Sequence, residues 1–187
     1  MAQTDSTEKG SAQTGDSAQT TKVIPYIIVL GNLAKINFNP GMSVADKSAT
    51  RNTLGEGADL INKNEGSLSQ SEITAISNVN SINVLNSHEE YMGATGRGSM
   101  SISAGYIQNS GAAWMGSILG HEGQHYLNSG KFTGGNLWKD EQKAGIVQLS
   151  IGIKIGMPEN QQIALSDWIN PSNAPAMQKH MLEGFQD

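Results

Sequence analysis

The chain has 187 residues, of which 37% are hydrophobic and 16% are charged, so it has enough apolar sequence to bury the core of one domain. Its formal net charge of −5 gives no sign of the basic surface that nucleic-acid-binding proteins need, and no nucleic-acid partner is expected. The absence of cysteine excludes disulfide frameworks, thiolate zinc sites, iron–sulfur clusters and cysteine nucleophiles.

Residues 1–22 are expected to form a flexible leader, followed by a single domain over residues 23–187. The leader repeats Ala-Gln-Thr and has no apolar residue larger than alanine between Met1 and Val23. Such a segment cannot offset the entropy cost of ordering by burying apolar surface. No apolar stretch approaches the roughly 18 residues of a membrane helix and no signal peptide is visible, so no membrane span is predicted.

The first half of the domain is expected to hold two helices between short strands. An apolar run over residues 23–30 predicts a strand. A serine that follows an Asn-Pro-Gly turn can cap a helix over residues 43–62. A Ser-x-x-Glu capping box predicts a second helix over residues 70–80, and a short strand is expected over residues 82–85.

The second half is expected to be mainly helical. Residues 100–106 alternate apolar and small polar side chains, which predicts a half-buried strand. Apolar residues at helical spacing predict a helix over residues 112–128, and Asn136 is expected to cap a long helix over residues 137–155. Two shorter helices are expected to close the chain, over residues 158–169 and 175–183. The expected fold class is therefore α+β, mostly helical with a small sheet.

His121, Glu122 and His125 form an H-E-x-x-H motif inside the helix expected over residues 112–128. Positions four apart on a helix differ by about 40° around its axis, so both imidazoles project from one face and can reach one zinc ion. Glu122 is displaced by about 100° and is placed to accept a proton from a metal-bound water. Because two of only 4 histidines in the chain fall in this pattern, we favour a zinc site over a pair of structural histidines.

This stretch resembles the HExxH zinc metallopeptidases, the zincins. The resemblance implies a fold in which an edge strand of the sheet runs along the substrate and precedes the motif helix. The strand expected over residues 100–106 and the helix over residues 112–128 match that pair. The resemblance also implies zinc as the cofactor and a protein or peptide as the substrate.

The third zinc ligand follows from comparing branches of this family. A metzincin-like continuation would need glycine and histidine where this chain has Asn128 and Lys131. In gluzincins the ligand is a glutamate on the next helix, and Glu141 opens a Glu-Gln-Lys-Ala stretch that resembles their E-x-x-A pattern. Glu141 is therefore the expected ligand, although Gly145 stands where gluzincins often have an aspartate.

Other polar residues are candidates for supporting roles. Asp140 is expected to orient a ligating histidine, and an acid in a first helical turn also suits the helix dipole. The oxyanion formed during amide hydrolysis needs an electrophile besides the zinc, for which Tyr106, Tyr91 and His180 are candidates.

Gly123 and the tryptophans have less specific interpretations. A glycine inside a helix costs roughly 1 kcal/mol relative to alanine, so Gly123 indicates close packing, room for substrate or simple drift. Trp114, Trp138 and Trp168 fall at helical positions and are interpreted as core residues rather than binding groups.

The function predicted from these residues is zinc-dependent hydrolysis of a peptide bond with Glu122 as general base. A small cysteine-free domain with a low-complexity leader is similar to bacterial effector and polymorphic-toxin metallopeptidase domains. That likeness implies delivery outside the producing cell and an inhibitory immunity protein as partner; otherwise a cytoplasmic location is expected. Two alternatives stay open, a non-catalytic binding module stabilised by zinc and an amide hydrolase directed at peptidoglycan. The lack of a good fourth protein ligand argues against a closed structural site.

Overall fold

Five short strands form one mixed sheet in the computed structural model, which describes residues 23–86, 92–95 and 98–183. The strands are β1 (Tyr26–Val29), β2 (Asn32–Phe38), β3 (Ser81–Leu85), β4 (Met92–Thr95) and β5 (Ser99–Ser103). Their order is β1-β2-β3-β5-β4, with β2, β3 and β5 parallel and the two edge strands antiparallel to their neighbours. The leader expected over residues 1–22 lies outside the described residues.

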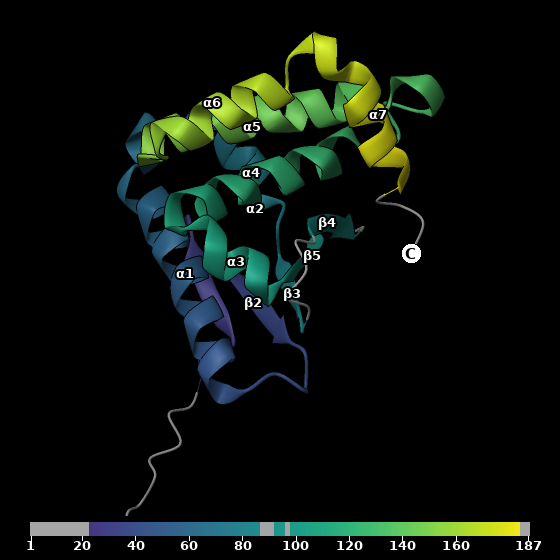
Figure 1. Ribbon diagram of the computed structural model, residues 1–187. Helices are drawn as coiled ribbons and strands as arrows, with labels where there is room; N and C mark the ends of the chain where they lie inside the picture. The colour runs from purple at the N-terminus through teal and green to yellow at the C-terminus, as the bar shows by residue number, and fades with distance from the viewer. Residues whose placement is uncertain (1–22, 87–91, 96–97, 184–187) are drawn as a thin grey trace, which may run out of the picture.

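Seven α-helices accompany the sheet within the described ranges, and α4, α5 and α6 are stacked above it (Figure 1). They are α1 (Val44–Lys63), α2 (Gln70–Ser77), α3 (Ala104–Ser110), α4 (Ala112–Asn128), α5 (Trp138–Ile155), α6 (Glu159–Trp168) and α7 (Ala174–Glu183). Three 3-10 turns connect them, η1 (Glu65–Ser67), η2 (Gly134–Asn136) and η3 (Pro171–Asn173). The α+β class expected from the sequence is confirmed.

The two faces of the sheet differ in chemistry because side chains alternate along each strand. The face toward the helices is apolar and fully buried, and includes Ile36, Ile82 and Ile102. The opposite face carries a hydrogen-bonded row of polar side chains, in which the Asn37 amide donates to Asn83 and the Asn83 amide donates to Ser99, each at 2.9 Å. The apolar core of the sheet therefore lies on the face that packs against the helices.

The motif helix α4 is the central helix, packed against α1, α2 and α5. Its glycines allow these close approaches. A Cβ on Gly116 would lie 2.8 Å from the carbonyl oxygen of Gly57 on α1, and a Cβ on Gly123 would overlap the carbonyl oxygen of Ala75 on α2. Of the three readings of Gly123, the structure therefore supports close packing, and the packing segment is α2.

The strand expected over residues 100–106 is shorter than predicted and is not at an edge. It ends at Ser103, whose hydroxyl accepts a hydrogen bond from the Tyr106 N–H at 3.2 Å and so caps the short helix α3. The strand before that, β4, pairs along the outer side of β5 and forms the edge of the sheet. The expected edge strand is thus β4 rather than residues 100–106.

The start of α5 also differs from the prediction. Asn136 belongs to the 3-10 turn η2 and does not cap α5, which begins at Trp138. The Trp138 N–H instead donates to the side-chain oxygen of Gln178, on α7, at 3.1 Å. A residue distant in sequence therefore supplies this cap.

Most other element predictions are confirmed. Ser43 caps α1, the capping box of Ser69 and Glu72 starts α2, and the bounds of α4 agree with the prediction. The run over residues 23–30 contains β1, which turns into β2 through Leu30 and Gly31, both at positive φ as a tight hairpin turn requires. Over the described part of the chain, no helix has the length and apolar character needed to cross a membrane.

Candidate metal centre

The site is built where α4 and α5 lie side by side. His121 and His125 project from one face of α4, and Glu141 comes from the first turn of α5. One ligand atom from each of these residues lies within 4.8 Å of the others, so the group can hold a metal ion. The structure thus brings together the three residues that the sequence analysis selected as ligands.

The distances between the three donor atoms fit a single small cation. The two Nε2 atoms are 2.9 Å apart, and Oε2 of Glu141 lies 3.6 Å from Nε2 of His121 and 3.3 Å from Nε2 of His125. Tetrahedral zinc with bonds of 2.0–2.1 Å separates its ligands by about 3.3 Å, which falls inside this range.

One oxygen of the Glu141 carboxylate has no hydrogen-bond partner among the described residues. This atom, Oε2, is buried and faces both imidazoles. A buried carboxylate oxygen without a hydrogen-bond partner is costly, because it has lost the hydrogen bonds that water would donate. A cation between the three donors would remove that cost, so the residues fit a bound metal.

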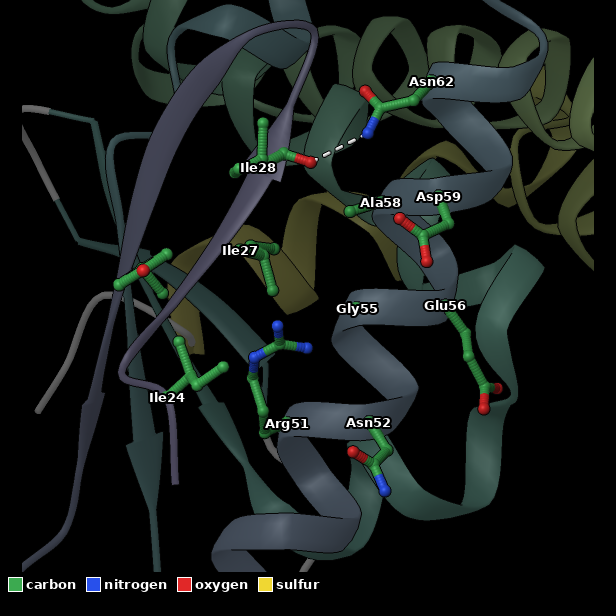
Figure 2. A pocket seen from close by; sticks show the side chains of 11 residues that line it. Ile24, Ile27, Ile28, Arg51, Asn52, Gly55, Glu56, Ala58, Asp59 and Asn62 are labelled. Carbon is green, nitrogen blue, oxygen red and sulfur yellow. Dashed lines mark hydrogen bonds between the residues drawn. The ribbon is translucent and has the colours of Figure 1, made fainter. Parts of the chain in front are cut away.

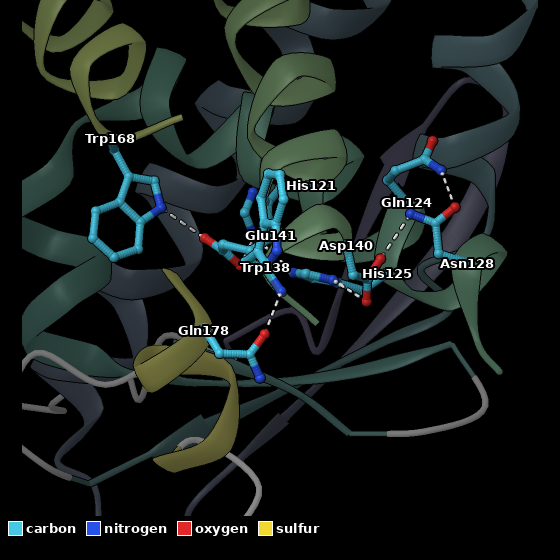
Figure 3. A network of polar contacts seen from close by, with 9 residues as sticks. All are labelled: His121, Gln124, His125, Asn128, Trp138, Asp140, Glu141, Trp168 and Gln178. Carbon is cyan, nitrogen blue, oxygen red and sulfur yellow. Dashed lines mark hydrogen bonds and ion pairs between the residues drawn. The ribbon is translucent and has the colours of Figure 1, made fainter. Parts of the chain in front are cut away.

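A chain of hydrogen bonds orients the imidazole of His125 (Figure 3). Oδ2 of Asp140 lies 3.0 Å from Nδ1 of His125, and Oδ1 of Asp140 accepts a hydrogen bond of 2.7 Å from the amide of Asn128. Gln124 donates in turn to Asn128 at 2.9 Å. Because Nδ1 of His125 contacts the Asp140 carboxylate, its Nε2 atom faces Nε2 of His121 and Oε2 of Glu141. The structure places Asp140 where an orienting acid was expected.

Trp168 contacts the site, which the sequence analysis did not foresee. Its indole N–H donates to Oε1 of Glu141 at 2.8 Å (Figure 3), so this tryptophan is more than a core residue. The ring of His180 contacts Trp168, edge-on to the indole at a centroid distance of 5.8 Å. A half-buried indole N–H needs an acceptor, but nothing in the local sequence says which one it finds.

The charges around the donors favour a positive charge between them. Burial by itself lowers the pKa of His125, but its contact with Asp140 and the nearby charge of Glu141 outweigh burial and raise that pKa to about 10. Burial raises the pKa of Glu141, yet the neighbouring imidazoles hold it far below its ordinary value. The carboxylate is therefore ionised and available to a cation.

Glu122 and Tyr106 occupy different parts of the motif region. Glu122 follows His121 on α4, is buried, and has an Oε2 atom without a hydrogen-bond partner among the described residues. Tyr106 accepts a hydrogen bond of 2.8 Å from Trp114, which lies two helical turns, or roughly 10 Å, before His121 on α4. Tyr91 lies outside the described residues.

A separate pocket of about 610 Å³ lies between β1 and α1 and includes none of the donor residues (Figure 2). Arg51 points into it, and the Asn62 amide closes one end by donating to the carbonyl of Ile28 at 2.9 Å and accepting from the N–H of Leu30 at 2.7 Å. Asn62 thus satisfies main-chain groups at the free edge of β1, which protects that edge from further pairing.

Comparison of the chain with family models, with curated proteins and with solved structures finds no match. What can be concluded about its function therefore comes from the residues of the site.

Proposed function

We propose that this chain is a zinc-dependent hydrolase of peptide bonds, with zinc held by His121, His125 and Glu141. The observation that carries the proposal is the convergence of two imidazole nitrogens on a buried carboxylate oxygen that has no other partner among the described residues. Glu122, next to His121 on the same helix, is the proposed general base.

Zinc is the metal that this donor set suits best. Two imidazoles and one carboxylate, at separations close to those of a tetrahedron, are typical of catalytic zinc sites with three protein ligands. When bound, such an ion supplies a Lewis acid that polarises a carbonyl group and makes a coordinated water more acidic.

Glu122 is suited to move the proton that hydrolysis requires. Its Oε2 atom has no hydrogen-bond partner among the described residues, so it is free to accept a proton from the attacking water. The water oxygen joins the carbonyl carbon, the carbon–nitrogen bond breaks, and Glu122 delivers the proton to the leaving amine.

The edge of the sheet nearest α4 is the proposed place for an extended substrate. β4 contacts α4 and, among the described strands, pairs with β5 alone. An extended peptide can add to such an edge through main-chain hydrogen bonds. This replaces the strand over residues 100–106, which the sequence analysis favoured for the same role.

One observation favours a second candidate, a binding module that zinc stabilises without catalysis. His121 and Glu141 are only 3% and 4% exposed, which suits a metal that joins α4 to α5. The Glu122 Oε2 atom, which has no hydrogen-bond partner among the described residues, and the lack of a fourth protein ligand within the described group weigh against this candidate. Peptidoglycan as the substrate stays an open alternative, and a toxin or effector role with an immunity protein stays a prediction from the family likeness.

The test combines zinc analysis with digestion of a peptide pool, using wild type, Glu122→Gln and the exposed control Glu65→Gln. We expect one zinc per chain in all three forms, with cleavage reduced about 10²–10⁴-fold in Glu122→Gln alone. Zinc in all forms without cleavage of peptides or of peptidoglycan would select the binding module. Cleavage of peptidoglycan alone would select that substrate, and a wild-type chain that takes up no zinc would overturn all of these readings.

A further inference from the structure

The two oxygens of the Glu141 carboxylate have different surroundings. Oε1 accepts the hydrogen bond of 2.8 Å from the indole N–H of Trp168. Oε2 faces the two histidine Nε2 atoms and has no hydrogen-bond partner among the described residues. We infer that Trp168 is a positioning residue that selects Oε2 as the only ligating oxygen of Glu141, an inference that rests on the proposed zinc site.

The number of Glu141 oxygens that bind the metal determines its coordination number. A carboxylate can bind a metal through one oxygen or through both. With Oε1 held by the indole, Glu141 occupies one position, and together with His121 and His125 it leaves the fourth tetrahedral position open to water or substrate. If Oε1 were released, the carboxylate could rotate and bind through both oxygens.

Trp168 is itself fixed by its neighbours, as a positioning residue must be. The ring of His180, on α7, meets the indole edge-on at an interplanar angle of 89°. The residue after Trp168, Ile169, is tied to α5 because its carbonyl accepts a hydrogen bond of 2.9 Å from the Gln142 side chain. A Cβ on Gly145 of α5 would overlap the side chain of Ile169, so α5 is in direct contact with the C-terminal end of α6.

The chain contains a matched control for this hydrogen bond. Trp114 also donates its indole N–H over 2.8 Å, but to the hydroxyl of Tyr106 rather than to a proposed ligand. Replacing either tryptophan with phenylalanine removes one N–H donor and keeps an aromatic ring. Only Trp168→Phe should therefore change the metal site, whereas both changes can alter packing.

The experiment measures zinc affinity by competition with a chromophoric chelator, and the visible spectrum of the Co²⁺-loaded protein, for wild type, Trp168→Phe and Trp114→Phe. We expect zinc to bind Trp168→Phe about 10–100-fold more weakly than wild type, and Trp114→Phe to stay within about 2-fold. The cobalt bands of Trp168→Phe should lose intensity, because a carboxylate that binds through both oxygens raises the coordination number above four.

The outcomes separate this inference from the proposed function. If wild type binds no zinc, the proposed site fails. If wild type binds zinc and Trp168→Phe has the same affinity and the same cobalt spectrum, the site stands and the positioning role is overturned. Equal losses of zinc affinity in Trp168→Phe and Trp114→Phe would assign the effect to packing and would also overturn the positioning role.

A second measurement keeps Trp168 in place, in case Trp168→Phe does not fold. The chain has 3 tryptophans, so a variant carrying Trp114→Phe and Trp138→Phe reports on Trp168 alone. Zinc should shift its fluorescence emission, because the acceptor of the indole N–H changes from a free carboxylate to a coordinated one. Emission that is unchanged by saturating zinc would contradict the inference.

Discussion

Asp140 and Glu141 are neighbours in sequence, yet they act on different atoms of the site. Consecutive residues on a helix diverge by about 100°, so the two carboxylates reach His125 from different sides. Asp140 lies at Nδ1, and Glu141 lies at Nε2. One turn of α5 thus supplies both a proposed ligand and the acid that orients another ligand.

Removing the charge of Asp140 should weaken zinc binding. Asp140→Asn keeps the size of the side chain, but its amide is a poorer acceptor for the Nδ1–H of His125 and can turn its NH₂ toward that ring. We expect the zinc dissociation constant to rise about 10–100-fold in chelator competition. Asp167→Asn, an exposed change on α6, is the control. Unchanged affinity in Asp140→Asn would show that the ring does not depend on this carboxylate.

Adding one methyl group at Gly123 should destabilise the fold, although alanine is the better helix former. The added Cβ would overlap a backbone carbonyl oxygen of α2, which cannot move aside as a flexible side chain can. We expect Gly123→Ala to lose about 1–3 kcal/mol of unfolding free energy in urea titration. Gly66→Ala, which has no atom within 4 Å of its added Cβ, should stay close to wild type. Equal stability of the two variants would refute this packing argument.

At the scale of the elements, one buried glutamate ties α2 to α5. Glu72 lies in the first turn of α2, where it completes the capping box, and it accepts hydrogen bonds from Lys154 and Ser150 of α5. Burial raises the pKa of Glu72, but Lys154 and the hydroxyl donors outweigh burial and lower it to about 2. This carboxylate therefore stabilises the folded chain in its ionised form.

The stability that Glu72 contributes should depend on pH. Its folded pKa is below the unfolded value of 4.5, so the contribution is full above pH 4.5 and is lost as the pH falls toward 2. The shift corresponds to about 3 kcal/mol of unfolding free energy at pH 7. We expect Glu72→Gln to be less stable than wild type at pH 7 and the difference to shrink by pH 3, with Glu65→Gln as control. A difference that is the same at both pH values would rule out the ionised carboxylate as its source.

How well each element could be predicted depends on whether its signals are local. The caps of α1 and α2 and the H-E-x-x-H spacing involve residues within one helical turn, so the sequence displays them directly. The first N–H of α5 is capped by the side chain of Gln178, and Oε1 of Glu141 accepts its hydrogen bond from Trp168. Both partners come from helices that follow later in the chain. Such long-range partners are set by packing, which no local pattern reports.

At the scale of the whole molecule, the proposed zinc joins two central helices of the fold. Because the ligands come from α4 and α5 and the supporting residues from α6 and α7, an ion there binds only the folded arrangement. A ligand that binds only the folded state stabilises it in proportion to the logarithm of its concentration.

Zinc should therefore raise the melting temperature of the chain. A free zinc concentration 100 times the dissociation constant should add about 2.7 kcal/mol of unfolding free energy, and a chelator should reverse the gain. His125→Ala should show no such shift, whereas Glu65→Ala, an exposed change in η1, should behave as wild type. A shift of the same size in His125→Ala would place the zinc elsewhere.

The hydrogen bond from Trp168 to Glu141 can form only after the ribosome has made all three proposed ligands. A ribosome makes both histidines first, then Glu141, and only afterwards the indole that holds its carboxylate. A nascent chain that ends before α6 would thus carry all three donors without the group that restrains the last of them. A cut between α5 and α6, followed by dissociation of the shorter fragment, would free the same carboxylate and leave every proposed ligand in the longer fragment.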